Sequence, residues 1–173
     1  MAKGGYAWTL DGPLPTIEDH SLAKHEVLRA YLVNYLRILA QNPNSEGIRV
    51  TLVDGFAGGG QYQTPAGSTV GGSPLVLLEA LEEARALVAL DRQQRNIRKP
   101  YTIHAHVHLI EKHAGTKTFL DRVIADSADA HAGNTTVEVH HSDFHKKLPD
   151  LLKDIQARQK KNGRSVFILD QYG

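Results

Sequence analysis

One stretch decides the fold of this chain, Val50-Thr51-Leu52-Val53-Asp54-Gly55-Phe56-Ala57-Gly58-Gly59-Gly60. An apolar run typical of a β-strand ends in an acidic residue and passes directly into a glycine-rich turn. Glycine has no Cβ, so such a turn can adopt positive φ and its backbone can approach a ligand closely. In open α/β sheets, ligands bind beyond the carboxyl ends of the strands, near the point where the strand order reverses. The stretch therefore predicts a strand whose end faces a nucleotide-like ligand.

The glycine spacing excludes two phosphate-binding motifs. The dinucleotide fingerprint Gly-x-Gly-x-x-Gly does not fit glycines at positions 55, 58, 59 and 60, and no Gly-Lys-Ser/Thr follows as in a P-loop. The acid instead precedes the glycines, in the form Asp-x-Phe-Ala-Gly-x-Gly that begins at Asp54. This form resembles the first motif of S-adenosylmethionine (SAM) dependent methyltransferases, whose sulfonium cofactor has no phosphates. The alternative is a tight strand-to-helix turn that binds nothing.

The composition is that of an ordinary globular protein. The chain has 173 residues, of which 41% are hydrophobic and 23% charged, enough for one domain with a sizeable core. The net charge of +1 gives no general reason to expect a nucleic-acid or membrane partner. The absence of Cys excludes disulfides, thiolate zinc sites and a cysteine nucleophile. No apolar run approaches the length of a membrane span. We therefore expect a cytoplasmic protein without a membrane partner.

Hydrophobic periodicity divides the chain into an arm and one α/β domain. Residues 1–20 are rich in Gly and Pro and predict an irregular N-terminal arm, anchored by Trp8. Residues 21–173 predict a Rossmann-like SAM-binding domain in which helices alternate with the strands of a mostly parallel sheet. Helices are expected at 21–41, 73–90, 116–128 and 145–161, and strands at 48–54, 103–110, 137–141 and 165–169. The polar segment 61–72 is expected to be a long loop that acts as a mobile flap. Because the pattern stops after its fourth strand, we expect a truncated methyltransferase fold, the N-terminal part of a larger one.

Each predicted strand is followed closely by an acid: Asp54, Glu111, Asp143 and Asp170. The carboxyl ends of parallel strands meet at one edge of a sheet, so these four side chains are expected to line one cleft. A carboxylate at Glu111 suits the two hydroxyls of a ribose. Asp143 with Phe144 suits an adenine, and Asp170 lies where a methyl acceptor would sit. Lys24 and His25 could face the same cleft, although a solvated helix face is the simpler interpretation.

The motifs together resemble the three-Cys-motif partner family, which belongs to the SAM-dependent methyltransferase-like superfamily. The residues that carry the resemblance are His20-Ser21-Leu22-Ala23-Lys24-His25, the stretch from Val53 to Gly60, Gly72-Ser73-Pro74, and Phe167-Ile168-Leu169-Asp170-Gln171-Tyr172-Gly173. The resemblance covers about residues 16–173. It implies SAM bound by Asp54, Gly55, Phe56, Ala57, Gly58 and Gly60, with Glu111 on the ribose and Asp143 at the adenine. It also implies a protein partner that carries a three-Cys motif.

The last motif resembles the Asp-Pro-Pro-Tyr of amino methyltransferases, with Gln171 in place of a proline. The resemblance implies catalytic roles for Asp170, which would grip the target amino group, and for Tyr172, which would stack on a flipped base. The predicted function is methyl transfer to a nucleic-acid base or a nucleotide-like acceptor. The alternative is a non-catalytic module that keeps the fold in order to bind a protein partner.

Two further patterns have competing interpretations. The basic connection at 91–101 could contact phosphates, but solvated linkers often look the same. His104, His106 and His108 alternate along one strand and so share a face, which would allow a Zn²⁺ site and even a metal hydrolase. His140 and His141 show no evident register with them, and we expect no carboxylate on that face. We therefore interpret it as a face of satisfied histidines and assign no metal ligand.

Overall fold

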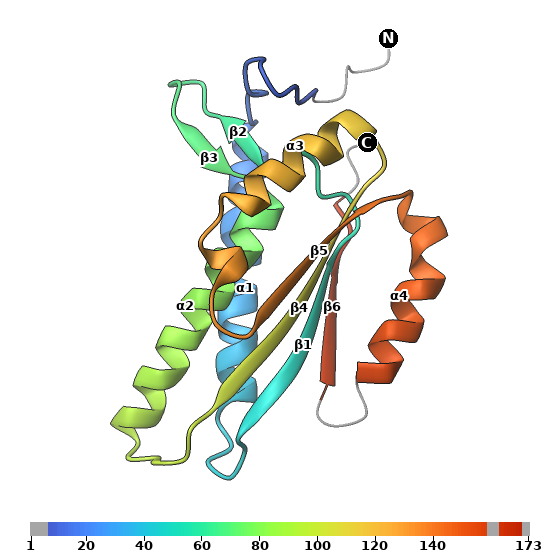
Figure 1. The fold of residues 1–173 in the computed structure, drawn as a ribbon. Coiled ribbons are helices and arrows are strands. Elements are labelled where there is room, and N and C mark those ends of the chain that lie inside the picture. The colour runs from blue at the N-terminus through green and yellow to red at the C-terminus, as the bar shows by residue number, and fades with distance from the viewer. Residues whose placement is uncertain (1–6, 159–162, 171–173) are drawn as a thin grey trace.

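The computed structural model describes residues 7–158 and 163–170 (Figure 1). Its helices are α1 (Asp19–Leu39), α2 (Ser73–Gln94), α3 (Ala114–Ala125) and α4 (Phe144–Arg158), with a short 3-10 helix at Asp129–His131. Its strands are β1 (Gly47–Asp54), β2 (Gln61–Gln63), β3 (Thr69–Gly71), β4 (Thr102–Glu111), β5 (Thr135–His141) and β6 (Gly163–Ile168). None of these described helices is both long and apolar enough to cross a membrane.

Four strands form one parallel sheet in the order β5-β4-β1-β6. From β1 the chain builds outward to β4 and β5, then returns to the other side of β1 with β6. The strand order therefore reverses at β1. This arrangement confirms the predicted α/β class with a mostly parallel sheet and is compatible with a Rossmann-like fold.

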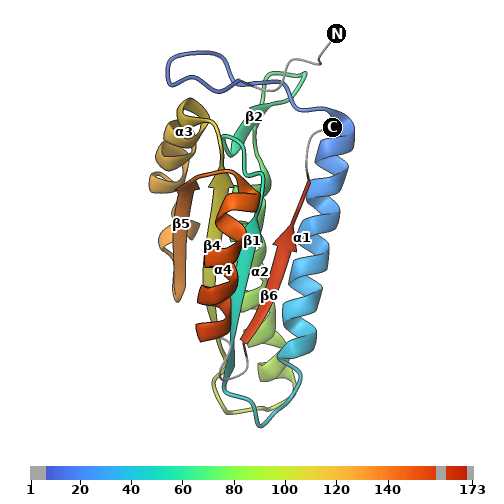
Figure 2. The same cartoon turned by 90° about the vertical axis from the view of Figure 1, so that its right-hand side faces the viewer.

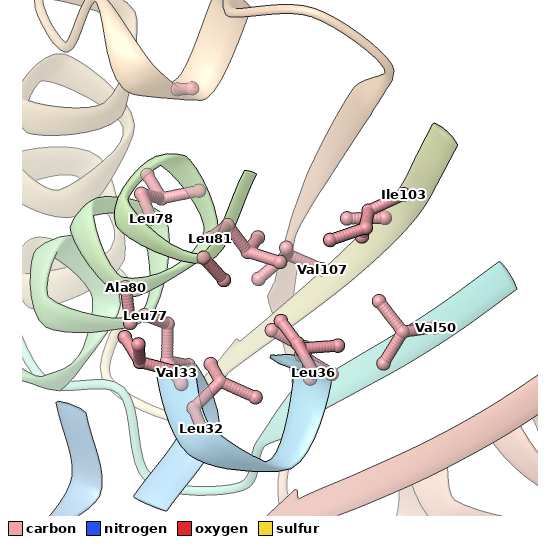
Figure 3. Packing of buried hydrophobic residues seen from close by; sticks show 14 of the residues in the cluster. Leu32, Val33, Leu36, Val50, Leu77, Leu78, Ala80, Leu81, Ile103 and Val107 are labelled. Atoms are coloured by element: carbon pink, nitrogen blue, oxygen red, sulfur yellow. The ribbon is translucent and has the colours of Figure 1, made fainter. Parts of the chain in front are cut away.

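The helices cover both faces of the sheet. In Figure 2, α1 and α2 lie behind the strands and α4 lies in front of them. The main core fills the first face, where the fully buried Leu36, Leu77 and Leu81 pack with Val50 and Val107 of the strands (Figure 3). Burial of each such leucine stabilises the fold by roughly 1.5–3 kcal/mol. Because the side chains of a strand alternate, the other residues of β1 and β4 face α4.

The face under α4 has a smaller core. It is formed by Val53 and Ile110 of the sheet and by Phe144, Leu151 and Ile155 of α4. The remaining inward positions on this face of β4 are histidines, so α4 covers a polar part of the sheet as well as an apolar one.

The segment 61–72 is a β-hairpin, and our expectation of a structureless loop was wrong. Strands β2 and β3 pair antiparallel, with Tyr62 opposite Val70, and Gly67 turns between them at a φ of 87°. Tyr62 is buried with Trp8, Ile17 and Phe119. Each strand is only three residues long and has one large apolar side chain, Tyr62 or Val70, so the alternation cannot be recognised in the sequence.

The N-terminal arm is partly ordered by this hairpin. Ile17 N donates to Gln63 O at 2.9 Å, and Gln63 N donates to Pro15 O at 2.9 Å. The indole Nε1 of Trp8 donates to Gln61 O at 2.6 Å, which confirms Trp8 as the anchor of the arm.

Other elements lie within a few residues of their predicted bounds. Helix α1 begins two residues early at Asp19, and α2 continues four residues past Leu90 to Gln94. Gly72, rather than Ser73, takes the N-cap position of α2, and Pro74 lies in its first turn. Strand β6 begins at Gly163, two residues before the expected start.

Three cations of the basic connection, Arg92, Arg95 and Lys99, make contacts within the fold. Arg92 is buried and its guanidinium donates to five backbone carbonyls, those of Ala40, Asn42, Pro43, Ser45 and Lys99. Arg95 donates to Gln41 O, and Lys99 pairs with Glu46 at 2.8 Å. These contacts join the connection after α2 to the connection after α1, which leaves Arg92 unable to bind phosphates.

Replacing Arg92 with Met is expected to lower the free energy of unfolding by about 3 kcal/mol, because five backbone carbonyls, one of them in a buried hydrogen bond, lose their donor. Arg95→Met is the matched control, since Arg95 is exposed and makes one such bond, and its effect should stay within about 0.5 kcal/mol. Urea unfolding followed by circular dichroism measures both. Equal effects of the two substitutions would show that Arg92 does not hold the connections together.

Candidate functional site

A hollow of about 260 Å³ opens at the carboxyl ends of β1 and β6. We call it the β1–β6 hollow; it is lined by Lys24, His25, Leu28, Asp54, Phe56, Ser73, Ile168, Leu169 and Asp170. It lies where the strand order reverses, the position at which open α/β sheets bind their ligands. Helix α1 contributes Lys24 and His25 to it, the end of β1 contributes Asp54, and the segment after β6 contributes Asp170.

Asp54 forms the buried acidic part of the hollow. Its side chain is only 2% exposed, and its Oδ1 accepts a hydrogen bond from Phe56 N at 3.1 Å. Its Oδ2 is buried with no hydrogen-bond partner in the described structure. Burial raises the pKa of Asp54 to about 6, although the nearby Ser73 hydroxyl and the Phe56 N–H oppose the rise. Oδ2 therefore has no direct hydrogen-bond partner, and the Ser73 hydroxyl and Phe56 N–H only partly offset the cost of burying the charge.

Lys24 and His25 both reach the hollow, contrary to the simpler interpretation as a solvated helix face. Lys24 Nζ donates to both carboxylate oxygens of Asp170, at 2.9 and 3.0 Å. His25 Nδ1 is buried and has no hydrogen-bond partner among the residues described. Burial lowers the pKa of His25, which favours the neutral ring at neutral pH. The hollow therefore combines a fixed cation, a neutral imidazole and two carboxyl groups.

The glycine turn ties β1 to both neighbouring strands. Gly55 N donates to Ile168 O of β6, and Ala57 N donates to Ile110 O of β4, both at 3.0 Å. Gly60 has a φ of 80°, in the left-handed region that favours glycine. The Trp8 ring covers Gly59 so closely that a Cβ there would lie 2.3 Å from the indole Cγ. Part of the turn is therefore packed against the arm.

The other predicted site residues lie at the same end of the sheet but outside the lining of the hollow. Glu111 is buried and its Oε1 accepts a bond from His113 N at 2.7 Å. Asp143 accepts from His145 N at 2.9 Å, in the first turn of α4. Phe144 is buried with its ring centroid 5.8 Å from that of Phe56. Their assigned contacts with ribose and adenine stay predictions, and only two of the four acids share the hollow.

Tyr172, assigned to stack on the acceptor, lies outside the described residues, as does Gln171. Asp170 is the last residue described, and its carboxylate is half-exposed at the rim of the hollow. The catalytic assignments of Asp170 and Tyr172 stay predictions.

The histidine face of the sheet differs from its interpretation above in two respects. Carboxylates do share it: Glu138 of β5 lies 2.7 Å from His106 Nε2, and Asp154 of α4 lies 3.4 Å from His108 Nε2. The histidines of the two strands are also in contact, since His108 Nδ1 lies 3.0 Å from His140 Nε2. We call these five residues the His–carboxylate cluster.

Strand register explains why this cluster was missed. In the parallel pair of β4 and β5, His108 is opposite Glu138, and Ile110 is opposite His140. Residues 138 and 140 thus alternate on the same face as residues 106 and 108. The sequence shows this alternation within each strand. It does not show the register between two strands that are separated by a helix. Asp154 reaches the cluster only because α4 packs on this face.

No protein-family model matches the chain, and a search of curated proteins finds no significant match.

The raised pKa of Asp54 predicts a pH-dependent stability. The folded-state pKa of about 6 lies above the reference value of 3.8, so the native state binds more protons between these values and loses stability as pH rises from about 4 to 6. Replacing Asp54 with Asn removes this loss. The free energy of unfolding of Asp54→Asn, relative to that of the wild type, should rise by about 3 kcal/mol between about pH 4 and pH 6 and then level off. Urea unfolding at a series of pH values measures it, and a difference independent of pH would contradict the assignment.

Proposed function

We propose that the chain binds SAM in and above the β1–β6 hollow and transfers its methyl group to a nucleic-acid base or nucleotide-like acceptor. One observation carries the proposal: a buried carboxylate, that of Asp54, has an oxygen without a partner at the end of the central strand. Buried polar groups without partners are rare in folded proteins, and such a group beside a hollow favours a ligand that supplies the missing donor.

The charges of the hollow complement the amino-acid end of SAM. Its ammonium group would donate to Asp54 Oδ2 and so replace the missing hydrogen bond. Its carboxylate would lie near Lys24, with the unpartnered Nδ1 of His25 as a further polar contact. At about 260 Å³ the hollow is smaller than most complete ligand sites. It therefore suits the methionine end of SAM, and the nucleoside would lie outside it.

The nucleoside end would extend along the carboxyl ends of the strands towards β4 and β5. Glu111 ends β4, and Asp143 follows β5 at the start of α4. Both carboxylates already accept one backbone N–H each, which fixes their orientation and leaves a second oxygen for a ligand. This direction of binding agrees with the roles predicted for Glu111 at the ribose and Asp143 at the adenine.

When bound, SAM supplies a methyl group on a sulfonium centre, which is already activated for transfer. The protein then needs mainly to align the acceptor with the methyl group. Asp170 stands at the rim of the hollow, where it would hold the acceptor's amino group or accept its proton. Its ion pair with Lys24 keeps the carboxylate in place. Tyr172 would pack against the acceptor, which must leave a base stack if it belongs to a duplex.

A feature of α1 favours the second candidate, a non-catalytic module that binds a protein partner, such as one with a three-Cys motif. Val27, Tyr31 and Ile38 are 69%, 55% and 61% exposed and lie at helical spacing on one face. A stripe of large apolar side chains of this kind is typical of an interaction surface. SAM binding without methyl transfer to any nucleic acid or nucleotide, together with a tight protein partner, would favour this candidate.

Calorimetric titration with SAM tests the proposed cofactor site. We expect binding in the micromolar range by the wild-type protein. Asp54→Asn keeps the shape of the side chain but removes the charge, so it should weaken binding at least about 10-fold, the equivalent of one charge-assisted hydrogen bond. Lys24→Gln should weaken it by a similar factor.

The matched control is Asp150→Asn, an exposed acid on α4 outside the hollow, which should bind like the wild type. Folding of each variant is checked by circular dichroism. The proposed site would be contradicted by the absence of a heat of binding in a folded wild-type sample, or by equal SAM affinities of the Asp54→Asn and Asp150→Asn variants.

A further inference from the structure

The His–carboxylate cluster contains three ligand atoms that converge on one point. His106 Nδ1 lies 3.7 Å and His108 Nε2 lies 3.4 Å from Asp154 Oδ2, and the three atoms are all within 4.8 Å of one another. Both histidine nitrogens are buried and lack hydrogen-bond partners in the part of the chain that the structure describes. Two side chains come from β4 and the third from α4, so the point lies between the sheet and the helix.

We propose that His106, His108 and Asp154 bind a divalent transition-metal ion of the Zn²⁺ class and thereby clamp α4 to the sheet. Zinc is bound tetrahedrally by imidazole and carboxylate at about 2.0–2.2 Å, which places neighbouring ligand atoms roughly 3.3 Å apart. The separations of 3.4 and 3.7 Å therefore need to shorten by only a few tenths of an ångström. A fourth position is left for water or another ligand.

The far nitrogens of both histidines are already held as metal ligands require. His106 Nε2 lies 2.7 Å from Glu138 Oε1, and His108 Nδ1 lies 3.0 Å from His140 Nε2. If each far nitrogen donates its proton to that partner, the near nitrogen presents a lone pair towards Asp154. Carboxylate–histidine–metal arrangements of this type orient the ring and raise its basicity. Glu138 and His140 thus act as positioning residues.

The donor types of the triad also suit such an ion. Two imidazoles and one carboxylate are ligands that zinc commonly takes in proteins. The imidazoles coordinate through ring nitrogens, and the carboxylate of Asp154 places a negative charge beside the cation.

A neighbouring arginine competes with the metal. Arg158 Nε lies 2.8 Å from Asp154 Oδ2, in an ion pair at the end of α4. The Arg158 side chain is 43% exposed, so it can turn towards solvent when an ion enters. Removing it should therefore strengthen metal binding, an effect opposite to that of removing a ligand.

A second triad in the same cluster, His108 with Glu138 and His140, is a weaker candidate. It would use His108 Nδ1, which is already in contact with His140 Nε2 at 3.0 Å. The first triad uses the nitrogens that have no other partner. It also links two layers of the fold, whereas the second lies on the sheet alone.

The test begins with full-length protein stripped of metal by a chelator. Titration with Co²⁺ should give the visible absorption bands of a four-coordinate ion, saturating at one ion per chain, and Zn²⁺ should displace it. Zn²⁺ should also raise the melting temperature, because it binds the folded state. Absence of these bands together with absence of Zn²⁺ binding by calorimetry would overturn the proposal.

Variants locate the ion. His106→Gln and Asp154→Asn should each weaken Zn²⁺ binding at least about 10-fold, and Arg158→Gln should strengthen it. His104→Gln is the matched control, since His104 is exposed on the same face of β4 and should bind as the wild type does. Should His106→Gln fail to fold, Asp154→Asn still decides, because Asp154 is partly exposed. Unchanged affinity in Asp154→Asn, or a loss in His104→Gln, would place the metal elsewhere and overturn the assignment.

Discussion

The burial of β1 on both faces is the constraint from which the proposed sites follow. Residues 50–54 of this strand are all buried, with α1 and α2 packed on one side and α4 on the other. The strand therefore ends at Asp54 inside the protein, where water cannot stabilise the carboxylate. A fold that keeps an acid in such a place loses stability when the acid ionises. Binding of a cationic group would recover part of that loss, which links the stability of the central strand to the proposed cofactor.

The packing of helices on both faces of the sheet also explains where the unpartnered polar atoms lie. Among the described residues, four buried side-chain nitrogen and oxygen atoms without a hydrogen-bond partner fall into two groups. His25 Nδ1 and Asp54 Oδ2 belong to residues that line the β1–β6 hollow, and His106 Nδ1 and His108 Nε2 converge on Asp154 under α4. The hollow opens at the end of the sheet, whereas the convergent atoms of the cluster lie between the sheet and α4. We therefore expect a reactant at the first and a structural ion at the second.

The sequence was sufficient for the main sheet and its helices because each of these elements carries its own signal. The apolar run before Asp54, the Gly-Ser-Pro helix start and the alternation of strands and helices predict the parallel sheet. It was insufficient wherever two distant segments meet. Lys24 reaches Asp170 through the packing of α1 beside β6, and Glu138 meets His106 through the register of β4 and β5. Neither contact leaves a local pattern. The β2–β3 hairpin was missed because three-residue strands are too short to show alternation.

The most direct test of the central claim is a nitrogen-15 NMR titration of the full chain with SAM. We expect the largest chemical-shift changes at the amides of residues 54–60, with further changes at Lys24 and His25. The reason is that the methionine end of SAM would lie between the glycine turn and the first part of α1. Shifts at these amides should saturate together with a single affinity. Absence of shifts at saturating SAM, or shifts confined to α4 and the outer face of α1, would contradict a cofactor site at the end of β1.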